Sequence, residues 1–231
     1  MSHFKRLCAA ILSVVMMVSV VSTSAFAVEN GPKYVENGIE YITVHDDENN
    51  TVQAIQRDVA TGECVYGPVI SVPSASEIEQ TPMPTVLGSD VHQDTFLNFE
   101  YDIWESDPRE WNLERPTSIF NQAYFRCYQN SSNRSELNDF KEDVDALNAQ
   151  EWVVIGGIGL TAYNTVKAYI ESHAAIASGG ILTAAAIDSI KDACVSLGAT
   201  SVAIGLLCTT YNNCAMSYKD ALNATDNIHY E

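Results

Sequence analysis

Residues 152–170 read WVVIGGIGLTAYNTVKAYI, and Lys167 is the only charged residue among them. Gly156, Gly157 and Gly159 each cost a helix in water about 1 kcal/mol relative to alanine, but glycines let two backbones approach closely. The fifteen residues before Lys167 are fewer than the ~20 that a bilayer-spanning helix needs. This stretch predicts a helical hairpin buried at the centre of a soluble bundle. The alternative is a hairpin that is hidden in solution and released into a bilayer.

Further helices are expected on both sides of this stretch. Upstream, Ser135 suits an N-cap, and an apolar stripe at helical spacing follows it: Leu137, Phe140, Val144 and Leu147. A helix is also expected from Thr117 to Tyr128, where apolar residues recur at three- and four-residue intervals. Downstream, residues 181–197 and 199–208 begin two more helices, with Gly198 as a C-terminal cap between them. Residues 117–231 are therefore predicted to form a helical domain.

The large apolar side chains of the uncharged helical segments are the candidates for contact with a membrane. They come from the hairpin and from the start of the last helix. The candidate residues are Trp152, Val153, Ile155, Ile158, Leu160, Val202, Ile204, Leu206 and Leu207.

The chain before the helical domain changes character twice. Residues 39–44, 51–57 and 64–72 are rich in β-forming residues and are separated by turn-forming clusters. They predict a β meander within an acidic leader, residues 28–72. Residues 73–116 combine a Pro-rich linker with a loop of aromatic and acidic residues. The predicted fold class is α+β, with a short N-terminal antiparallel meander and a mostly helical C-terminal bundle that buries its Gly/Ala-rich hairpin.

The first 27 residues have the three-part pattern of a secretory signal peptide. Lys5 and Arg6 precede an uncharged apolar run, and small residues close it at Ala25 and Ala27. We therefore expect cleavage after Ala27 and a mature protein that is secreted and extracellular.

The chain is strongly acidic, with 12 Lys and Arg against 30 Asp and Glu and a formal net charge of −18. Nucleic acid binding depends on basic side chains that displace counterions, so a nucleic acid partner is not expected. Attraction to anionic lipid alone is not expected for the same reason. Any action at a membrane would therefore require a receptor or unfolding to bring the chain there.

Five cysteines follow the predicted cleavage site, so at least one thiol has no partner within the chain. Disulfides persist outside the cell. Two cysteines six residues apart on one helix are separated by about 9 Å of rise, which is too far for a disulfide. Any bridge must join different elements, and the candidates for pairing are Cys127, Cys194, Cys208 and Cys214.

The sequence contains no recognised catalytic or cofactor motif. It lacks a GxSxG elbow, an HExxH zinc motif, a phosphate-binding GxxxxGK[ST] loop and an EF-hand loop. We expect no enzyme activity, no cofactor and no metal site. The histidines are scattered along the chain and are predicted to be surface residues rather than bases or ligands: His45, His92, His173 and His229.

The acidic and aromatic residues between positions 94 and 114 leave other uses open. Carboxylates such as Glu100, Asp102 and Glu105 could serve glycoside hydrolysis, and aromatic faces could bind a sugar. The favoured interpretation is a solvated loop whose aromatic side chains pack on the helices.

Several segments in order resemble a known family. The stretch VHQDTFLNFEYDI at 91–103 is followed by EWNLERP at 110–116, YQNSSN at 128–133 and the Gly/Ala-rich helices. Together they resemble the geobacillin-26 family of large, secreted, bacteriocin-like proteins of Gram-positive bacteria. The likeness covers residues 91–231 best. It implies antibacterial activity against related bacteria and supplies no catalytic residues.

The predicted function is therefore that of a secreted bacteriocin-like antibacterial protein. It would act at the target-cell membrane or on an envelope receptor, by inserting its apolar helices, after loss of the leader at the linker. The alternative is a non-catalytic secreted binding or envelope-associated module that uses residues 94–114 as its contact surface.

Overall fold

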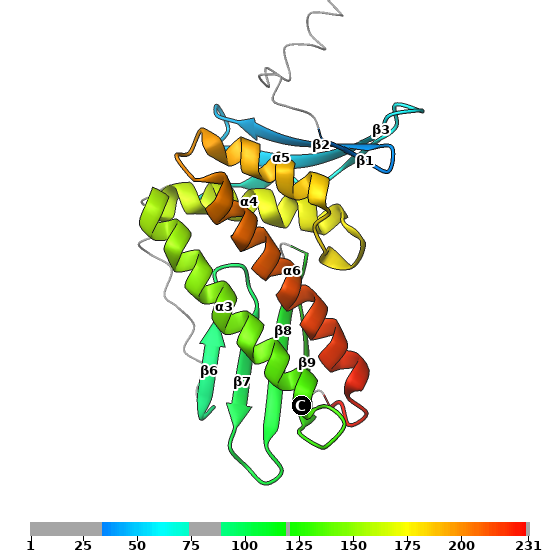
Figure 1. The fold of residues 1–231 in the computed structure, drawn as a ribbon, viewed down its shortest axis with the longest axis vertical. Coiled ribbons are helices and arrows are strands. Elements are labelled where there is room, and N and C mark those ends of the chain that lie inside the picture. The colour runs from blue at the N-terminus through cyan, green and yellow to red at the C-terminus, as the bar shows by residue number, and fades with distance from the viewer. Residues whose placement is uncertain (1–33, 74–88, 119–120, 230–231) are drawn as a thin grey trace, which may run out of the picture. The chain divides into compact units, whose positions relative to one another are not determined.

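The computed structural model describes three ranges of the chain: residues 34–73, 89–118 and 121–229. Every element described below belongs to one compact unit within Pro32–Glu231 (Figure 1). The signal peptide expected over residues 1–27 lies outside the described residues and stays a prediction.

The first sheet, sheet A, has five antiparallel strands: β1 (Tyr34–Glu36), β2 (Ile39–Asp46), β3 (Thr51–Asp58), β4 (Cys64–Tyr66) and β5 (Ile70–Ser71). Strands β1 to β4 are neighbours in chain order, and β5 pairs with a separate part of β3. Asn37 and Gly38 have φ angles of 51° and 81°, as the tight turn of the β1–β2 hairpin requires. Val52 and Ile70 of sheet A, and Val72 directly after β5, belong to the main core.

The second sheet, sheet B, has four antiparallel strands in chain order: β6 (Val91–Asp94), β7 (Glu100–Trp104), β8 (Glu110–Ser118) and β9 (Asn121–Tyr128). Successive side chains of a strand point to opposite faces of the sheet. One face is apolar and fully buried, and it is made of Tyr101, Ile103, Trp111, Leu113, Phe125 and Cys127. The alternate residues lie on the other face, which we call the open face.

Four α-helices and one 3-10 turn complete the described part of the chain: α3 (Arg134–Ile158), α4 (Leu160–Ile176), η1 (Ser178–Gly180), α5 (Ala184–Val195) and α6 (Ser201–Ala224). Helices α3 and α6 lie over the apolar face of sheet B (Figure 1), where the rings of Phe125 and Tyr218 are 5.3 Å apart. Helices α4 and α5 pack on sheet A. There, Thr43 of β2 is hydrogen-bonded to His173 of α4 and to Ser189 of α5, each at 2.8 Å.

The predicted fold class is wrong in its architecture, because a second sheet replaces the expected loop and first helix. Residues 91–128 form sheet B, and the helix expected from Thr117 to Tyr128 is strand. In the folded strand burial alternates with period two, since Phe125 and Cys127 are buried while Tyr124 and Tyr128 are exposed. The helices therefore cover sheets and do not form a self-contained bundle.

The expected burial of the hairpin is wrong for its Gly-rich half, whereas the α4 half is buried from Tyr163 to Ile170 apart from the partly exposed Asn164 and Lys167. Gly156 and Gly157 are exposed, and a Cβ built on either glycine would meet no atom within 4 Å. Gly159 separates α3 from α4 and has a φ of 82°. Glycine adopts this positive φ without the strain that a side chain would cause. Among the described residues, no helix has both the length and the apolar character needed to span a bilayer.

Candidate functional site

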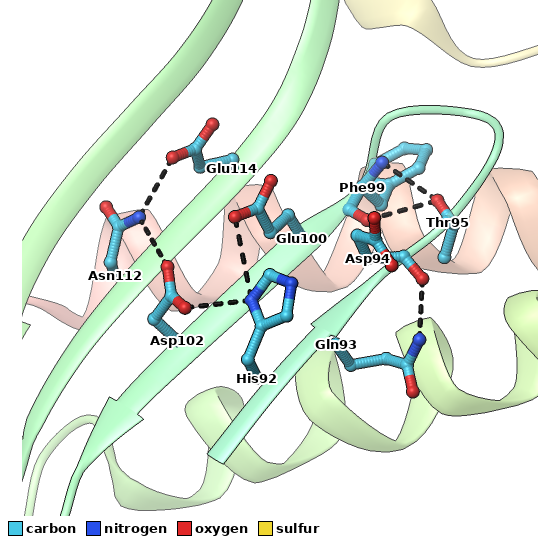
Figure 2. Close-up of polar contacts among 9 residues, drawn as sticks. All are labelled: His92, Gln93, Asp94, Thr95, Phe99, Glu100, Asp102, Asn112 and Glu114. Carbon is cyan, nitrogen blue, oxygen red and sulfur yellow. Dashed lines mark hydrogen bonds and ion pairs between the residues drawn. The ribbon is translucent and has the colours of Figure 1, made fainter. Parts of the chain in front are cut away.

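The open face of sheet B carries two rows of polar side chains that cross strands β6, β7 and β8. In the first row, His92 pairs with Asp102, which pairs with Asn112. In the second row, Asp94 pairs with Glu100, which pairs with Glu114. The two rows are two residues apart on each strand, so their side chains lie on the same face (Figure 2).

His92, Glu100 and Asp102 form the centre of this arrangement, which we call the His92 cluster. The Nδ1 atom of His92 lies 2.9 Å from Oδ1 of Asp102 and 3.7 Å from Oε1 of Glu100 (Figure 2). One ligand atom from each of the three residues lies within 4.8 Å of the others. Three groups that commonly bind metals therefore converge on one point of a rigid sheet.

Asn112 holds the carboxylates beside this cluster. Its Nδ2 atom donates to Oδ2 of Asp102 at 3.2 Å and to Oε1 of Glu114 at 2.9 Å. Its side-chain oxygen is buried and has no hydrogen-bond partner in the described chain. Asn112 is only 4% exposed, so its fixed amide restrains the orientation of the Asp102 carboxylate.

The His92 cluster has an excess of negative charge. The side chain of Asp102 is 2% exposed and that of Glu100 is 18% exposed. Among the described residues, no lysine or arginine lies within ion-pair distance of either carboxylate. Burial, followed by repulsion from Glu114 and Asp102, raises the pKa of Glu100 to about 7. The site therefore opposes the addition of further negative charge and favours a proton or a cation.

Sequence reasoning missed the His92 cluster, because it treated His92 as an isolated surface residue. The signal that could have found it is hairpin register: a short turn over 95–99 brings position 92 opposite position 102. Two of the carboxylates considered for hydrolysis, Glu100 and Asp102, do come together. The third, Glu105, lies in the β7–β8 connection and is paired with Arg109 at 2.5 Å.

The nine predicted membrane-contact residues separate into buried and exposed sets. Ile204 and Leu207 are fully buried, and three others pack against the core while partly exposed: Ile155, Ile158 and Leu160. The remaining four are exposed, and we call them the apolar helix end: Trp152 (56%), Val153 (61%), Val202 (72%) and Leu206 (52%).

The apolar helix end joins the C-terminal part of α3 to the N-terminal part of α6. Gln150 of α3 donates a hydrogen bond to the backbone oxygen of Ala203 in α6 at 3.2 Å, which places these two helix segments side by side. The ring of Trp152 packs edge-on against Phe96, with centroids 5.4 Å apart. Residues 152–166 and 193–218 contain no Asp, Glu, Lys or Arg, and the Lys191 side chain of α5 packs beside Gly205 of α6.

The cysteines proposed for disulfide pairing are all free thiols in the described chain. Cys127, Cys194, Cys208 and Cys214 are buried, whereas Cys64 is exposed. Burial raises the pKa of Cys127 to about 11 and that of Cys208 to about 12, so these thiols stay protonated and unreactive. Pairing among the four buried cysteines stays a prediction.

Of His173 and His229, only His173 is buried, contrary to its predicted surface position, because the side chain of His229 is 26% exposed. His173 is 1% exposed, and burial lowers its pKa to about 4, so the ring is neutral at physiological pH. His229 lies 3.1 Å from Glu110 and stacks on Tyr128 at the edge of the open face. Neither histidine reaches the His92 cluster through a contact in the described chain.

Comparison with known proteins identifies no relative of this chain. No protein-family model, no curated protein and no solved structure matches the chain.

Proposed function

We propose that this protein is a secreted, bacteriocin-like antibacterial protein that acts at a bacterial cell envelope through its apolar helix end. The observation that supports the proposal is the exposure of Trp152, Val153, Val202 and Leu206, each more than half exposed. Large exposed apolar patches mark membrane or protein contact sites. The sequence resemblance to the geobacillin-26 family supports the antibacterial assignment.

The proposed contact is attachment to the lipid surface by exposed side chains. Ile204, Leu207 and Tyr211 of α6 are buried, so pulling this helix into a bilayer would open the core. Trp152 suits a membrane–water interface, where an indole ring places its apolar body in lipid and its N–H near water. Attachment therefore requires no rearrangement of α3 or α6.

The charge distribution favours neutral lipid or an envelope receptor over anionic lipid. The whole chain has a formal net charge of −18, so an anionic membrane repels it. The segments that supply the apolar helix end carry no charge, so repulsion is weakest there. Each Å² of apolar surface removed from water contributes ~25 cal/mol, and this term drives the attachment.

Vesicle flotation with neutral phosphatidylcholine, run beside growth inhibition of Gram-positive cells, tests the proposal. The test variant combines Val153→Ser, Val202→Ser and Leu206→Ser, which change exposed side chains. The matched control combines Val59→Ser, Val65→Ser and Val69→Ser on sheet A and its turns, where the valines are 57%, 56% and 59% exposed. We expect the test variant to partition about 100-fold more weakly, because each lost side chain removes roughly 1 kcal/mol of transfer free energy.

The outcome that contradicts the proposal is equal behaviour of the two triple variants in both assays. Inactive wild-type protein in both assays contradicts it as well. Circular dichroism of every variant confirms that the comparison concerns folded protein.

The second candidate function is a non-catalytic binding module that uses the open face of sheet B. The favouring observation is that exposed aromatic side chains share this sheet with the carboxylate rows. Tyr124 is 50% exposed and lies opposite Glu114, and Tyr128 is 40% exposed and lies opposite Glu110. Aromatic faces beside fixed hydrogen-bonding groups suit a cell-wall glycan. Pull-down on purified peptidoglycan separates this function from the first, because a vesicle lacks the glycan.

A further inference from the structure

We infer that His92, Glu100 and Asp102 bind a divalent transition-metal ion on the open face of sheet B, and that zinc is the ion that fits best. The inference does not depend on the apolar helix end or on antibacterial activity. It concerns a site on a different element, and it is argued from ligand type, ligand distance and charge.

The ligand distances match a small metal centre. In a tetrahedral zinc site, bonds of about 2.0–2.1 Å place neighbouring ligand atoms roughly 3.3 Å apart. The distances from Nδ1 of His92 are 2.9 Å to Asp102 and 3.7 Å to Glu100, on either side of that value. Movements of a few tenths of an ångström within ordinary rotamers therefore complete the geometry.

The sheet supplies the rigidity that a metal centre needs. His92 and Asp102 are directly paired across β6 and β7, and Glu100 lies two residues from Asp102 on the same strand. Paired strands fix backbone positions more firmly than a loop does. Asn112 holds the far oxygen of Asp102 and leaves Oδ1, the oxygen nearest His92, directed at the proposed ion.

The arrangement of charge also favours a cation at this site. Asp94, Glu100 and Glu114 lie directly opposite one another on three neighbouring strands. Like charges in directly opposed positions destabilise a sheet. Within the described residues, the one basic side chain in contact with Glu100 and Asp102 is His92. A divalent ion would offset this repulsion.

The ligand set selects the class of metal. Imidazole suits zinc and other first-row transition metals, whereas calcium and magnesium prefer oxygen ligands alone. Three protein ligands leave a fourth position of a tetrahedral ion for water. The side chain of His92 is 30% exposed, so solvent and an entering ion reach the site.

Calorimetric titration of zinc chloride into the chelator-stripped full chain tests the inference. All proteins carry Cys64→Ser, because Cys64 is an exposed thiol that could bind zinc by itself. We expect one ion per chain with a micromolar or tighter dissociation constant. His92→Ala and Glu100→Gln should each weaken binding at least 100-fold.

His45→Ala is the matched control, because His45 also faces a carboxylate, Asp47, at 3.5 Å. It should leave zinc affinity unchanged. Asn112→Ala should weaken binding roughly 10- to 100-fold, as removal of groups that orient metal ligands does. Circular dichroism confirms that each variant is folded.

Several results overturn the inference. Absence of one-to-one binding does so, and so does equal zinc affinity in the His92 and His45 variants. Tighter binding of calcium or magnesium than of zinc overturns the assignment to a transition metal. Zinc binding without vesicle binding supports this inference and contradicts the proposed function. Vesicle binding without zinc binding does the reverse.

Discussion

Glu151 is a fully buried carboxylate at the meeting point of α3, α4 and the turn before β7. Its oxygens accept hydrogen bonds from the backbone N–H groups of Phe96 and Leu97 at 2.9 and 2.8 Å. They also accept one from the hydroxyl of Tyr163 at 2.9 Å. Burial raises the pKa of Glu151 to about 7 despite these hydrogen bonds. A single side chain thus connects three segments that are distant in sequence.

Glu151→Ala should lower the free energy of unfolding by about 3 kcal/mol or more, because it leaves buried donors without acceptors. Urea denaturation measures this change. Glu142→Gln is the control on the same helix, since Glu142 is exposed, and its expected effect is under about 0.5 kcal/mol. A loss no larger than that of the control would show that the Glu151 hydrogen bonds do not stabilise the fold.

The raised pKa of Glu151 also predicts a dependence of stability on pH. The folded chain holds the proton up to about pH 7, whereas an unfolded Glu releases it near 4.5. The contribution to stability is therefore present below pH 4.5 and is lost as the pH rises to about 7. Glu151→Gln should remove this component from a series of urea denaturations. An unchanged pH profile in that variant would contradict the assignment to Glu151.

At the scale of elements, the glycines show that composition and packing carry different information. Gly156 and Gly157 are in a helix and contact nothing that an added methyl group would meet. Gly67 follows β4, and its Cβ would lie 2.8 Å from both the backbone and side-chain oxygens of Ser172 in α4. The close approach that glycine permits therefore lies between sheet A and α4, and the Gly-rich segment of α3 does not provide it.

Gly156→Ala should raise the free energy of unfolding by about 0.5–1 kcal/mol, because alanine favours the helix and space is free. Gly67→Ala should lower it by about 1–3 kcal/mol, because the added methyl group overpacks the contact with Ser172. Urea denaturation of both variants gives the signs directly. Destabilisation by Gly156→Ala would contradict this expectation and would support the tight hairpin packing that the sequence predicts.

At the scale of the whole described molecule, the acidic leader is part of the core. Val52, Ile70 and Val72 of the leader belong to the same apolar cluster as the helices. The backbone N–H of Ala54 donates to Ser172 Oγ at 2.7 Å. Arg57 and Glu40 pair within the sheet. Loss of residues 34–72 would therefore uncover α4 and α5, and the leader is more than a detachable cover.

A chain cut between sheet A and β6 should remain associated. We expect that cleavage at a protease site engineered between residues 74 and 88 leaves both fragments co-eluting in native size-exclusion chromatography. The fragments should separate in urea, because burial of the leader's apolar side chains holds them together. The chain without the engineered site, treated with the same protease, is the control. Separation in native buffer would show that the leader is released by cleavage alone.

The strands show which parts of the fold could be predicted from the sequence and which could not. The strands of the leader are readable from alternating β-branched residues, and β2 and β3 occur where the pattern predicts them. In 117–128 the apolar residues fit both helical and alternating spacing. Ladder pairing with β8 decides the strand there, and no local pattern contains that information.

The sequence by itself determined the acidity, strands β2 and β3, the helical stripe that begins after Ser135 and the uncharged runs around 152–166 and 193–218. These properties are local, since composition and short-range periodicity fix them. The predicted third strand at 64–72 is two short strands, β4 and β5. Only the tertiary structure decided that His92 meets Asp102, and that Trp152 and Val202 stay exposed while Ile204 and Leu207 are buried. Strand register and helix rotation set these outcomes, and both depend on which distant side chains pack together.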